Sequence, residues 1–253
     1  MTIKQRFAAL FTAVLILLGV TTTALAATLV KNTSVTVTVN QQQYTFTERP
    51  RLVEVLAPQA LSQPWYWPAS KLFLLNAKPE MQRQQLLQQL QALIATTNQQ
   101  LKPGLAALQK ELTGWQLGQR IPIRIDYDLA RADAALNPRF EPGQYQLLLT
   151  ERPTGVRFFG AVPYSVTMKH IDATTVQSYL VGLPLLSVAD PQFVVVIQPD
   201  GRILNAGTQS WNWQHLEVMP GAMVYIPFAT GWFSADFSAL NKHIPALAVH
   251  RMY

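Results

Sequence analysis

Alternating apolar and polar residues near the start of the chain predict a β-hairpin. Residues 34–39 place a branched apolar side chain at every second position, as expected of a strand with one buried face. Asn40 and the glutamines after it favour a turn, and residues 44–46 predict the returning strand. Pro50 stands where helices often begin, and the apolar residues between it and Pro58 predict a short helix. Strand, strand and helix in this order indicate an α+β unit.

The next part of the pattern predicts a helical hairpin. Between residues 79 and 100, apolar side chains recur at spacings of three, four and seven, which marks one face of a helix. The Lys-Pro-Gly sequence at 102–104 interrupts this periodicity, and leucines spaced over 105–112 predict a second, shorter helix. We therefore expect an insertion at about 78–114, inside the first β-rich domain.

Strand-like alternation resumes at residues 121–128. Odd positions are apolar and even positions are mostly charged, so we expect one strand that carries all of its charges on a single face. The charged residues in or beside this segment are Arg120, Arg124, Asp126 and Asp128, with Arg131 just beyond.

A Pro-Gly pair begins an apolar strand twice in the chain. Pro142-Gly143 and Pro220-Gly221 each form a turn signal, because proline presets φ and glycine accepts a positive φ. Such a repeat suggests two related modules. The second module repeats the order of the first, with strands at 156–162 and 166–168 and then a helix for which Asp172 is a candidate N-cap. A buried strand at 193–197 follows, and the turn at 199–201 leads into another.

This order of elements favours an α+β fold of two tandem β-grasp domains over a β-sandwich. We place the first domain at 27–151, the second at 152–230 and a C-terminal helix at 231–253. The apolar stripe of that helix steps by three and four through Phe233, Phe237, Leu240, Ile244 and Leu247, which is the pattern of an amphipathic helix. We favour docking of this stripe onto the second domain, and the alternative is a surface offered to a membrane or a partner.

The first 26 residues have the pattern of a cleavable signal peptide. Lys4 and Arg6 precede an apolar run over 7–20, and small residues then lead to Ala26. An uncleaved anchor is the alternative. The chain contains no cysteine, which excludes a lipidated N-terminal cysteine, a disulfide framework and a thiolate metal site. We expect an exported protein that is not a lipoprotein.

The net charge of the chain adds little to these predictions about fold and function. Cleavage after Ala26 removes Lys4 and Arg6 and no acidic residue, so the net charge of +6 becomes +4. This mild excess could favour an anionic glycan or a membrane surface, but it is too diffuse for nucleic-acid binding.

The charged segment and an aromatic cluster are the candidate binding groups. Arginines on a concave surface could grip an anionic or hydroxyl-rich ligand, but we favour a solvated face with weak ion pairs. The rings at 65–67, which include Trp67, could stack on sugars, although such rings more often seal a loop against a core. The same two interpretations apply to Trp211, Trp213 and His215. The four histidines lack metal-ligand spacing, and no nucleophile elbow, phosphate loop or dinucleotide fingerprint occurs, so we expect no metal and no cofactor.

Taken together, several segments resemble the GfcC-type capsule biosynthesis family. They are Trp67-Pro68, the helical hairpin, residues 118–131, residues 141–145, Arg152-Pro153, residues 159–162, Trp211-Asn212 and Pro220-Gly221. They occur in the same order over nearly the whole expected mature chain.

The resemblance implies a periplasmic protein of group 4 or O-antigen capsule formation. It implies two β-grasp domains like the SLBB-like domains of outer-membrane polysaccharide export proteins, with a helical insertion and a C-terminal amphipathic helix. It also implies an arginine in a cleft near the insertion, in a Gly-Arg-apolar-Pro motif. Arg120 takes that position here, although Gln119 intervenes after Gly118. No established activity comes with the resemblance.

We therefore expect a non-enzymatic periplasmic accessory protein of capsular polysaccharide assembly or export, acting as a monomer. Its expected partners are the capsule machinery and capsular polysaccharide. The alternative is a polysaccharide-binding protein or polysaccharide-modifying enzyme that uses a cleft around Arg120, and a third hypothesis is a peripheral membrane protein. The candidate ligand-binding residues are Arg120, Arg124, Asp126, Arg131 and Trp67, and no residue is assigned a catalytic or metal-binding role.

Overall fold

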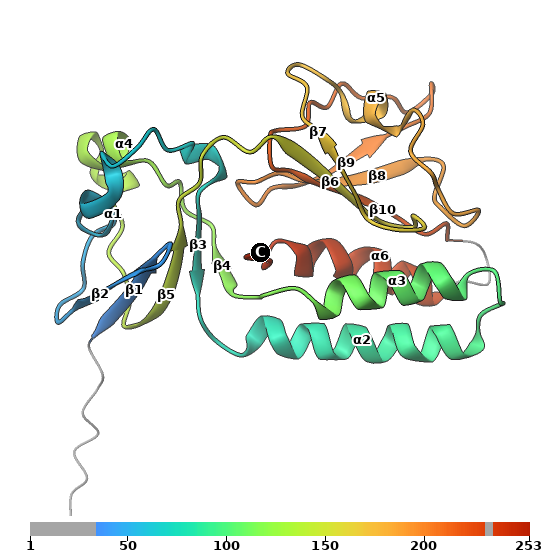
Figure 1. The fold of residues 1–253 in the computed structure, drawn as a ribbon, viewed down its shortest axis with the longest axis horizontal. Helices are drawn as coiled ribbons and strands as arrows, with labels where there is room; N and C mark the ends of the chain where they lie inside the picture. The colour runs from blue at the N-terminus through green and yellow to red at the C-terminus, as the bar shows by residue number, and fades with distance from the viewer. Residues whose placement is uncertain (1–33, 231–234) are drawn as a thin grey trace, which may run out of the picture. The chain divides into compact units, whose positions relative to one another are not determined.

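The computed structural model of the protein describes residues 34–230 and 235–253. The expected signal peptide and Phe233 lie outside the described residues. The described chain forms two five-stranded mixed β-sheets with helices packed against them, which confirms the α+β class and the two tandem units (Figure 1).

The first sheet has the strand order β2-β1-β5-β3-β4. Its central strand β5 runs parallel to β1 and antiparallel to β3, and the remaining pairs are antiparallel. The strands are β1 (Val35–Val39), β2 (Gln42–Phe46), β3 (Lys71–Leu74), β4 (Gln119–Ile121) and β5 (Gly143–Leu148).

The second sheet repeats this topology strand for strand. Its order is β7-β6-β10-β8-β9, and its central strand β10 again runs parallel to the first strand of the unit. The strands are β6 (Gly155–Gly160), β7 (Val166–Lys169), β8 (Phe193–Ile197), β9 (Ile203–Gly207) and β10 (Met223–Ile226). The two Pro-Gly strands, β5 and β10, thus take the same central place, which explains the repeat. Gly221 has a φ of +86°, a conformation that disfavours other residues.

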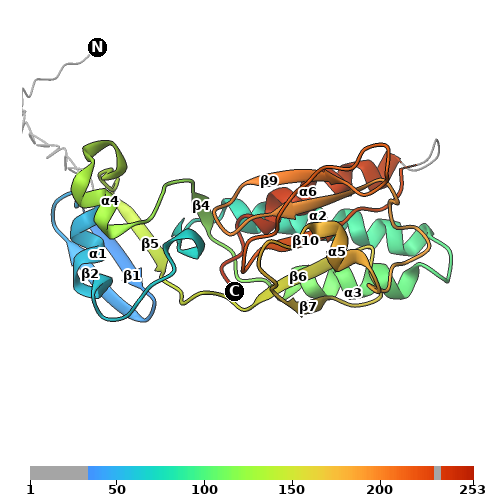
Figure 2. The same ribbon diagram turned by 90° about the horizontal axis from the view of Figure 1, so that it is seen from above.

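One face of the first sheet is closed by two helices. Leu52, Val55 and Leu56 of α1 (Leu52–Ala60) and Ala130 of α4 (Tyr127–Ala132) are buried in one core with the valines of β1. Figure 2 shows both helices over this sheet. A 3₁₀ turn at Trp67–Ala69 precedes β3, and another at Ala134–Leu136 follows α4.

The prediction of one long strand over 121–128 is wrong. Strand β4 ends at Ile121, because Pro122 has no N–H for the ladder and proline is excluded from strand interiors. Asp126 instead caps α4, where its carboxylate accepts the backbone N–H of Leu129 at 3.1 Å. Ile125 still turns inward and is buried in the core. The charges therefore do not share one strand face.

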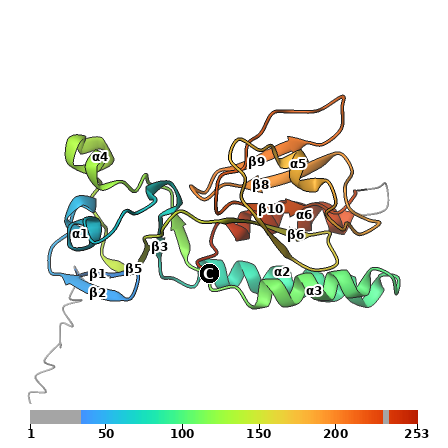
Figure 3. The same ribbon diagram turned by 45° about the horizontal axis from the view of Figure 1, so that its top comes forward.

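The helical hairpin packs on the second sheet, although it is inserted between strands of the first. Its helices are α2 (Lys78–Thr96) and α3 (Lys102–Thr113), so Lys102 and Pro103 begin the second helix. Leucines of both helices share a core with Phe158, Phe159 and Tyr225 of the second sheet. Figure 3 shows the hairpin lying along one face of this sheet with α6 (Ala235–Ala248).

The apolar stripe of the C-terminal helix is part of the same core. Leu240, Ile244 and Leu247 of α6 are almost fully buried, and Phe237 stacks on Phe228 with ring centroids 5.0 Å apart. The stripe thus docks on the second unit, as favoured above, and these side chains are not presented to a membrane. None of the described helices is long and apolar enough to span a bilayer.

Two further details differ from the sequence-based expectations. Helix α5 (Val176–Leu180) begins after Thr175, so Asp172 is not its N-cap. Asp172 instead pairs with Arg152 at the surface. Strand β3 was not predicted, because its run of three apolar residues lacks the alternation of a half-buried strand. Both of its faces are covered, with Leu72 in the first core and Phe73 beneath Arg120.

Candidate functional site: a hollow around Arg120

Arg120 is a buried arginine whose guanidinium is only partly satisfied. Its side chain leaves β4, and the residue is 7% exposed. One terminal nitrogen, Nη2, donates to the carbonyl oxygens of Pro199 at 3.0 Å and Ser70 at 3.4 Å, and the guanidinium lies 5.4 Å from the centre of the Phe73 ring. Its Nε is buried and has no hydrogen-bond partner among the described residues. A buried polar group without a partner costs free energy, so an acceptor from a ligand would be favourable here.

The charge of Arg120 also lacks a close counterion. Within the described ranges, no carboxylate forms an ion pair with it. Burial lowers the pKa of Arg120 to about 10, and the negative charge of Asp200 acts in the opposite direction. The guanidinium therefore remains charged at neutral pH. A desolvated guanidinium of this kind binds an anion with two oxygens, such as a carboxylate, favourably.

The hollow in front of Arg120 has a volume of about 510 Å³. It gathers four of the predicted residues, namely Trp67, Arg120, Arg124 and Asp126. Arg131 is absent from its lining, because it lies on α4 with its guanidinium 5.6 Å from the centre of the Tyr127 ring. The other lining groups include Ser70, Asp200 and Arg202.

The two carboxylates of the hollow are already committed to structural roles. Asp126 caps α4 through Leu129. Asp200 accepts the Arg202 Nε–H at 2.6 Å and the Arg202 backbone N–H at 3.0 Å, which holds the β8–β9 turn. A carboxyl group that acts as a general acid or base must be free to exchange a proton with the substrate. Both lining carboxylates are instead held by hydrogen bonds within the protein, and the arginines and Trp67 of the lining are groups that can bind an anion or a sugar. In the part of the chain that the structure covers, no cluster of three or more metal-ligating side chains occurs.

The aromatic residues divide into two groups. Trp67 is half-buried, packs against the first core and still contributes to the hollow, so both interpretations of this ring apply. Trp211 and Trp213 are 70% and 52% exposed, and for them the interpretation as core-sealing rings is wrong. His215 lies beside Trp213, with the two ring centroids 5.9 Å apart.

The backbone around Arg120 is held by a residue near the C-terminus, His250. The Nδ1 of His250 accepts the Arg120 backbone N–H at 3.0 Å, and the His250 carbonyl accepts the Gly118 N–H at 3.0 Å. Burial is the main reason why the pKa of His250 is lowered, which keeps Nδ1 available as an acceptor. Gln119, which stands between Gly118 and Arg120 and departs from the family motif, accepts a hydrogen bond from the Asn76 side chain at 2.6 Å. No local motif signalled His250, because its partner lies 130 residues earlier in the chain.

Comparisons with known proteins agree with this architecture. Residues 31–152 match the family described as "Capsule biosynthesis GfcC, N-terminal", and residues 164–253 match "Capsule biosynthesis GfcC C-terminal". An uncharacterised Escherichia coli (strain K12) protein, YjbG, is 30% identical over 202 residues, which cover 79% of this chain and 82% of that protein. The boundary between the two matched regions falls near the linker that joins the two sheets. The chain therefore belongs to the GfcC family of capsule biosynthesis proteins.

Proposed function

We propose that the protein is a non-enzymatic periplasmic accessory of capsular polysaccharide assembly or export, and that it holds an anionic part of the polysaccharide in the hollow around Arg120. Membership of the capsule family supplies the process. The signal-peptide pattern over residues 1–26 supports a periplasmic location. The capsule export or assembly machinery is the expected protein partner.

The observation that carries the proposal is the unmet bonding capacity of Arg120. Arg120 is buried, and among the described residues no carboxylate pairs with it and no acceptor meets its Nε. Such a cation is costly to keep unless a ligand supplies the missing acceptor. Acidic sugars offer a carboxylate, and Trp67 at the same hollow offers a ring surface on which a sugar can stack. Arg124 and Arg202 add positive charge at the lining.

The alternative is a polysaccharide-modifying enzyme at the same hollow. Such an enzyme would need a proton donor or acceptor there, and the available carboxylates are Asp126 and Asp200. Both are bound to backbone N–H groups of their own turns or helices. This arrangement favours binding over bond cleavage.

The Arg120→Met variant tests the proposal in capsule-forming cells. We expect surface capsule, measured with a capsule-specific antibody, to fall severalfold while the level of the protein stays constant. The matched control is Arg131→Met, which removes an arginine outside the hollow and should leave capsule display unchanged. Normal display in the Arg120 variant would refute the role of the hollow.

The non-enzymatic part has a separate test. Capsular polymer isolated from a strain without the protein should keep its monosaccharide composition and linkages, because only its assembly or export is impaired. A change in linkage or substituents would favour the enzyme instead.

The periplasmic location has its own test. Protein recovered from a periplasmic fraction should begin at Ala27 by N-terminal sequencing, and an intact N-terminus at Met1 would contradict cleavage.

A further inference from the structure

The second face of the first sheet is polar and uncharged over three adjacent strands. Directly opposed residues on neighbouring strands share a face, and the register places Thr36 between Thr45 and Gln144. The next row along places Thr38 between Gln43 and Gln146. All six side chains are half-buried or exposed. Only Gln146 makes a side-chain hydrogen bond within the described residues, to the Asn40 carbonyl at 3.0 Å.

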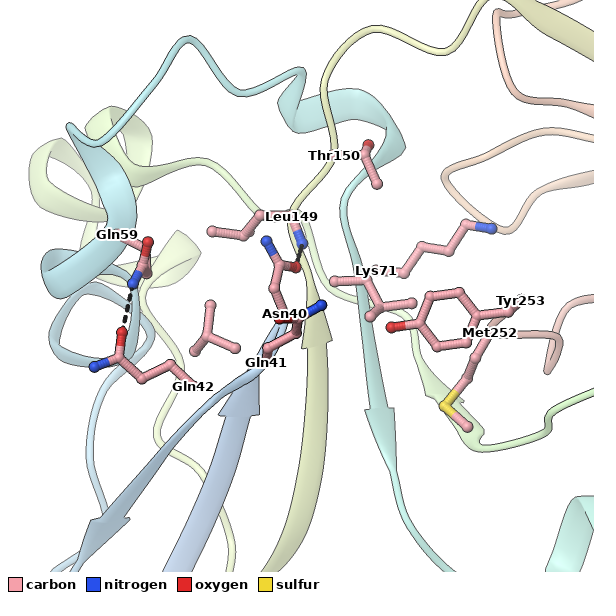
Figure 4. A pocket seen from close by; sticks show the side chains of 11 residues that line it. Asn40, Gln41, Gln42, Gln59, Lys71, Leu149, Thr150, Met252 and Tyr253 are labelled. Atoms are coloured by element: carbon pink, nitrogen blue, oxygen red, sulfur yellow. Dashed lines mark hydrogen bonds between the residues drawn. The ribbon is translucent and has the colours of Figure 1, made fainter.

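A second hollow of about 630 Å³ lies at one end of this sheet. Figure 4 shows amide side chains from the β1–β2 turn on one side of it, and Lys71 and Tyr253 on the other. Its polar lining includes Asn40, Gln41, Gln42, Gln59, Lys71 and Thr150. It is distinct from the Arg120 hollow, since the two share no lining residue.

Among the residues that line this hollow, Lys71 carries the positive charge, and no described residue pairs with it. It stands on β3 opposite Leu148, and its ammonium makes neither a hydrogen bond nor an ion pair with any described residue. Burial is the main reason why the pKa of Lys71 is lowered to about 8, and the positive charges of Arg120 and Arg251 lower it further. A bound anion would offset both effects.

Thr150 is a second unmet group at the same place. Its hydroxyl oxygen, Oγ1, is buried and has no hydrogen-bond partner among the described residues. Tyr253 adds a ring that is 58% exposed, which offers a flat apolar surface beside the amides. This lining suits a ligand with many hydroxyls and a single negative charge. The amides and the Thr150 hydroxyl can hydrogen-bond hydroxyl groups, the Lys71 ammonium can pair with the charge, and the Tyr253 ring can stack on the ligand. A phosphate site would be expected to present arginine forks or several backbone N–H groups.

We propose that this second hollow binds an acidic sugar residue of a polysaccharide, with the Lys71 ammonium on the sugar carboxylate. The threonines and glutamines of the adjoining sheet face then hydrogen-bond the neutral residues next to it in the same polysaccharide chain. The choice of a polysaccharide as the ligand rests on the proposed function. The site itself is argued from its own lining residues, and Arg120 is not one of them.

The test measures binding of aldotetraouronic acid, an oligosaccharide of one acidic sugar and three neutral ones, to the purified full chain by calorimetry at pH 7. Its methyl-esterified form is the matched probe, because it keeps the sugar and removes the charge. Loss of a charged hydrogen bond should make Lys71→Met bind the acid at least about tenfold more weakly. Lys71→Arg should retain most of the affinity. Lys169→Met, which removes an exposed lysine from the second sheet, should bind like the unaltered protein.

A second measurement follows Lys71 directly. In protein whose lysines carry ¹³C-methyl groups, the NMR signal that is missing from Lys71→Arg reports the titration of Lys71. Its pKa should rise when aldotetraouronic acid binds. Thermal unfolding of Lys71→Met confirms that the variant is folded.

Several results would overturn the inference. They are no binding of aldotetraouronic acid, equal binding of its methyl ester, or unchanged affinity in Lys71→Met. If Arg120→Met loses binding and Lys71→Met does not, the acid binds only at the first hollow, so the inference fails and the proposed function stands. If Lys71→Met loses binding while Arg120→Met leaves capsule display normal, the second site stands and the proposed role of Arg120 fails.

Discussion

Removing the charge of Lys71 should stabilise the fold at neutral pH. The folded protein holds this amine at a pKa of about 8 instead of its ordinary 10.5, mainly because the amine is desolvated. One pKa unit corresponds to about 1.4 kcal/mol, so carrying the proton at pH 7 costs the folded state at most about 3.5 kcal/mol. Methionine keeps an unbranched apolar side chain in the same place and carries no charge.

The sign of the pH dependence follows from the direction of the shift. The folded pKa lies below the unfolded one, so the native protein binds this proton less readily than the unfolded chain does. The favourable contribution of the neutral amine is therefore fully present above about pH 10.5 and is lost as the pH falls through about 8. The advantage of Lys71→Met over the unaltered protein should be largest below pH 8 and should shrink towards pH 10.5.

Urea unfolding at pH 7 and at higher pH measures this difference. We expect a gain of about 1 to 3 kcal/mol at pH 7, and each kcal/mol corresponds to about 2–4 °C in Tm for a chain of this size. Lys169→Met is the control and should change the free energy of unfolding by less than about 0.5 kcal/mol. A Lys71→Met variant that is less stable at pH 7, or whose gain is the same at all pH values, would refute the reasoning. A gain in stability combined with weaker binding would indicate that Lys71 is kept for function.

Three further predictions concern the fold. Leu240→Ala should lower the free energy of unfolding by about 2–5 kcal/mol, because it opens a cavity in the second core, and an unchanged urea midpoint would contradict the docking of α6. Gly160→Ala should cost more than Gly182→Ala in thermal unfolding; both glycines have positive φ, but only at Gly160 would a Cβ lie 2.3 Å from the Ile226 carbonyl oxygen. Equal losses would show that backbone conformation alone decides. Asp126→Ala should cost about 1 kcal/mol through the lost N-cap of α4, and Asp126→Asn should recover most of it; equal losses in both variants would contradict the capping role.

Local patterns predicted the parts of the fold whose cause is local. Strands β1 and β8 and the turn between β8 and β9 followed from alternation, a run of apolar residues and a Pro-Asp-Gly sequence. The Pro-Gly repeat predicted two related units, and the strands that follow the two Pro-Gly pairs, β5 and β10, take the same central place in their sheets. Arg120 and Trp67 were also named from the sequence, through the family resemblance and the aromatic cluster.

The pattern of apolar and polar residues was misleading in two segments, once for a local reason and once because of tertiary packing. The alternation over 121–128 looked like a strand, yet Pro122 cannot donate to a ladder and Asp126 satisfies a helix terminus instead. Strand β3 is apolar on both sides because the first core covers one face and Arg120 the other.

The sequence by itself determined the class of fold, the repeat and the arginine, since periodicity, turn chemistry and family motifs are all carried by short segments. Only the tertiary structure decided which sheet the helical hairpin covers and that the C-terminal stripe is buried. It also decided that Pro199 and Ser70 hold Arg120, and that Lys71, Thr150 and Tyr253 line one second hollow. The physical reason is that burial and desolvation depend on every group packed around a side chain, and these groups lie far apart along the chain.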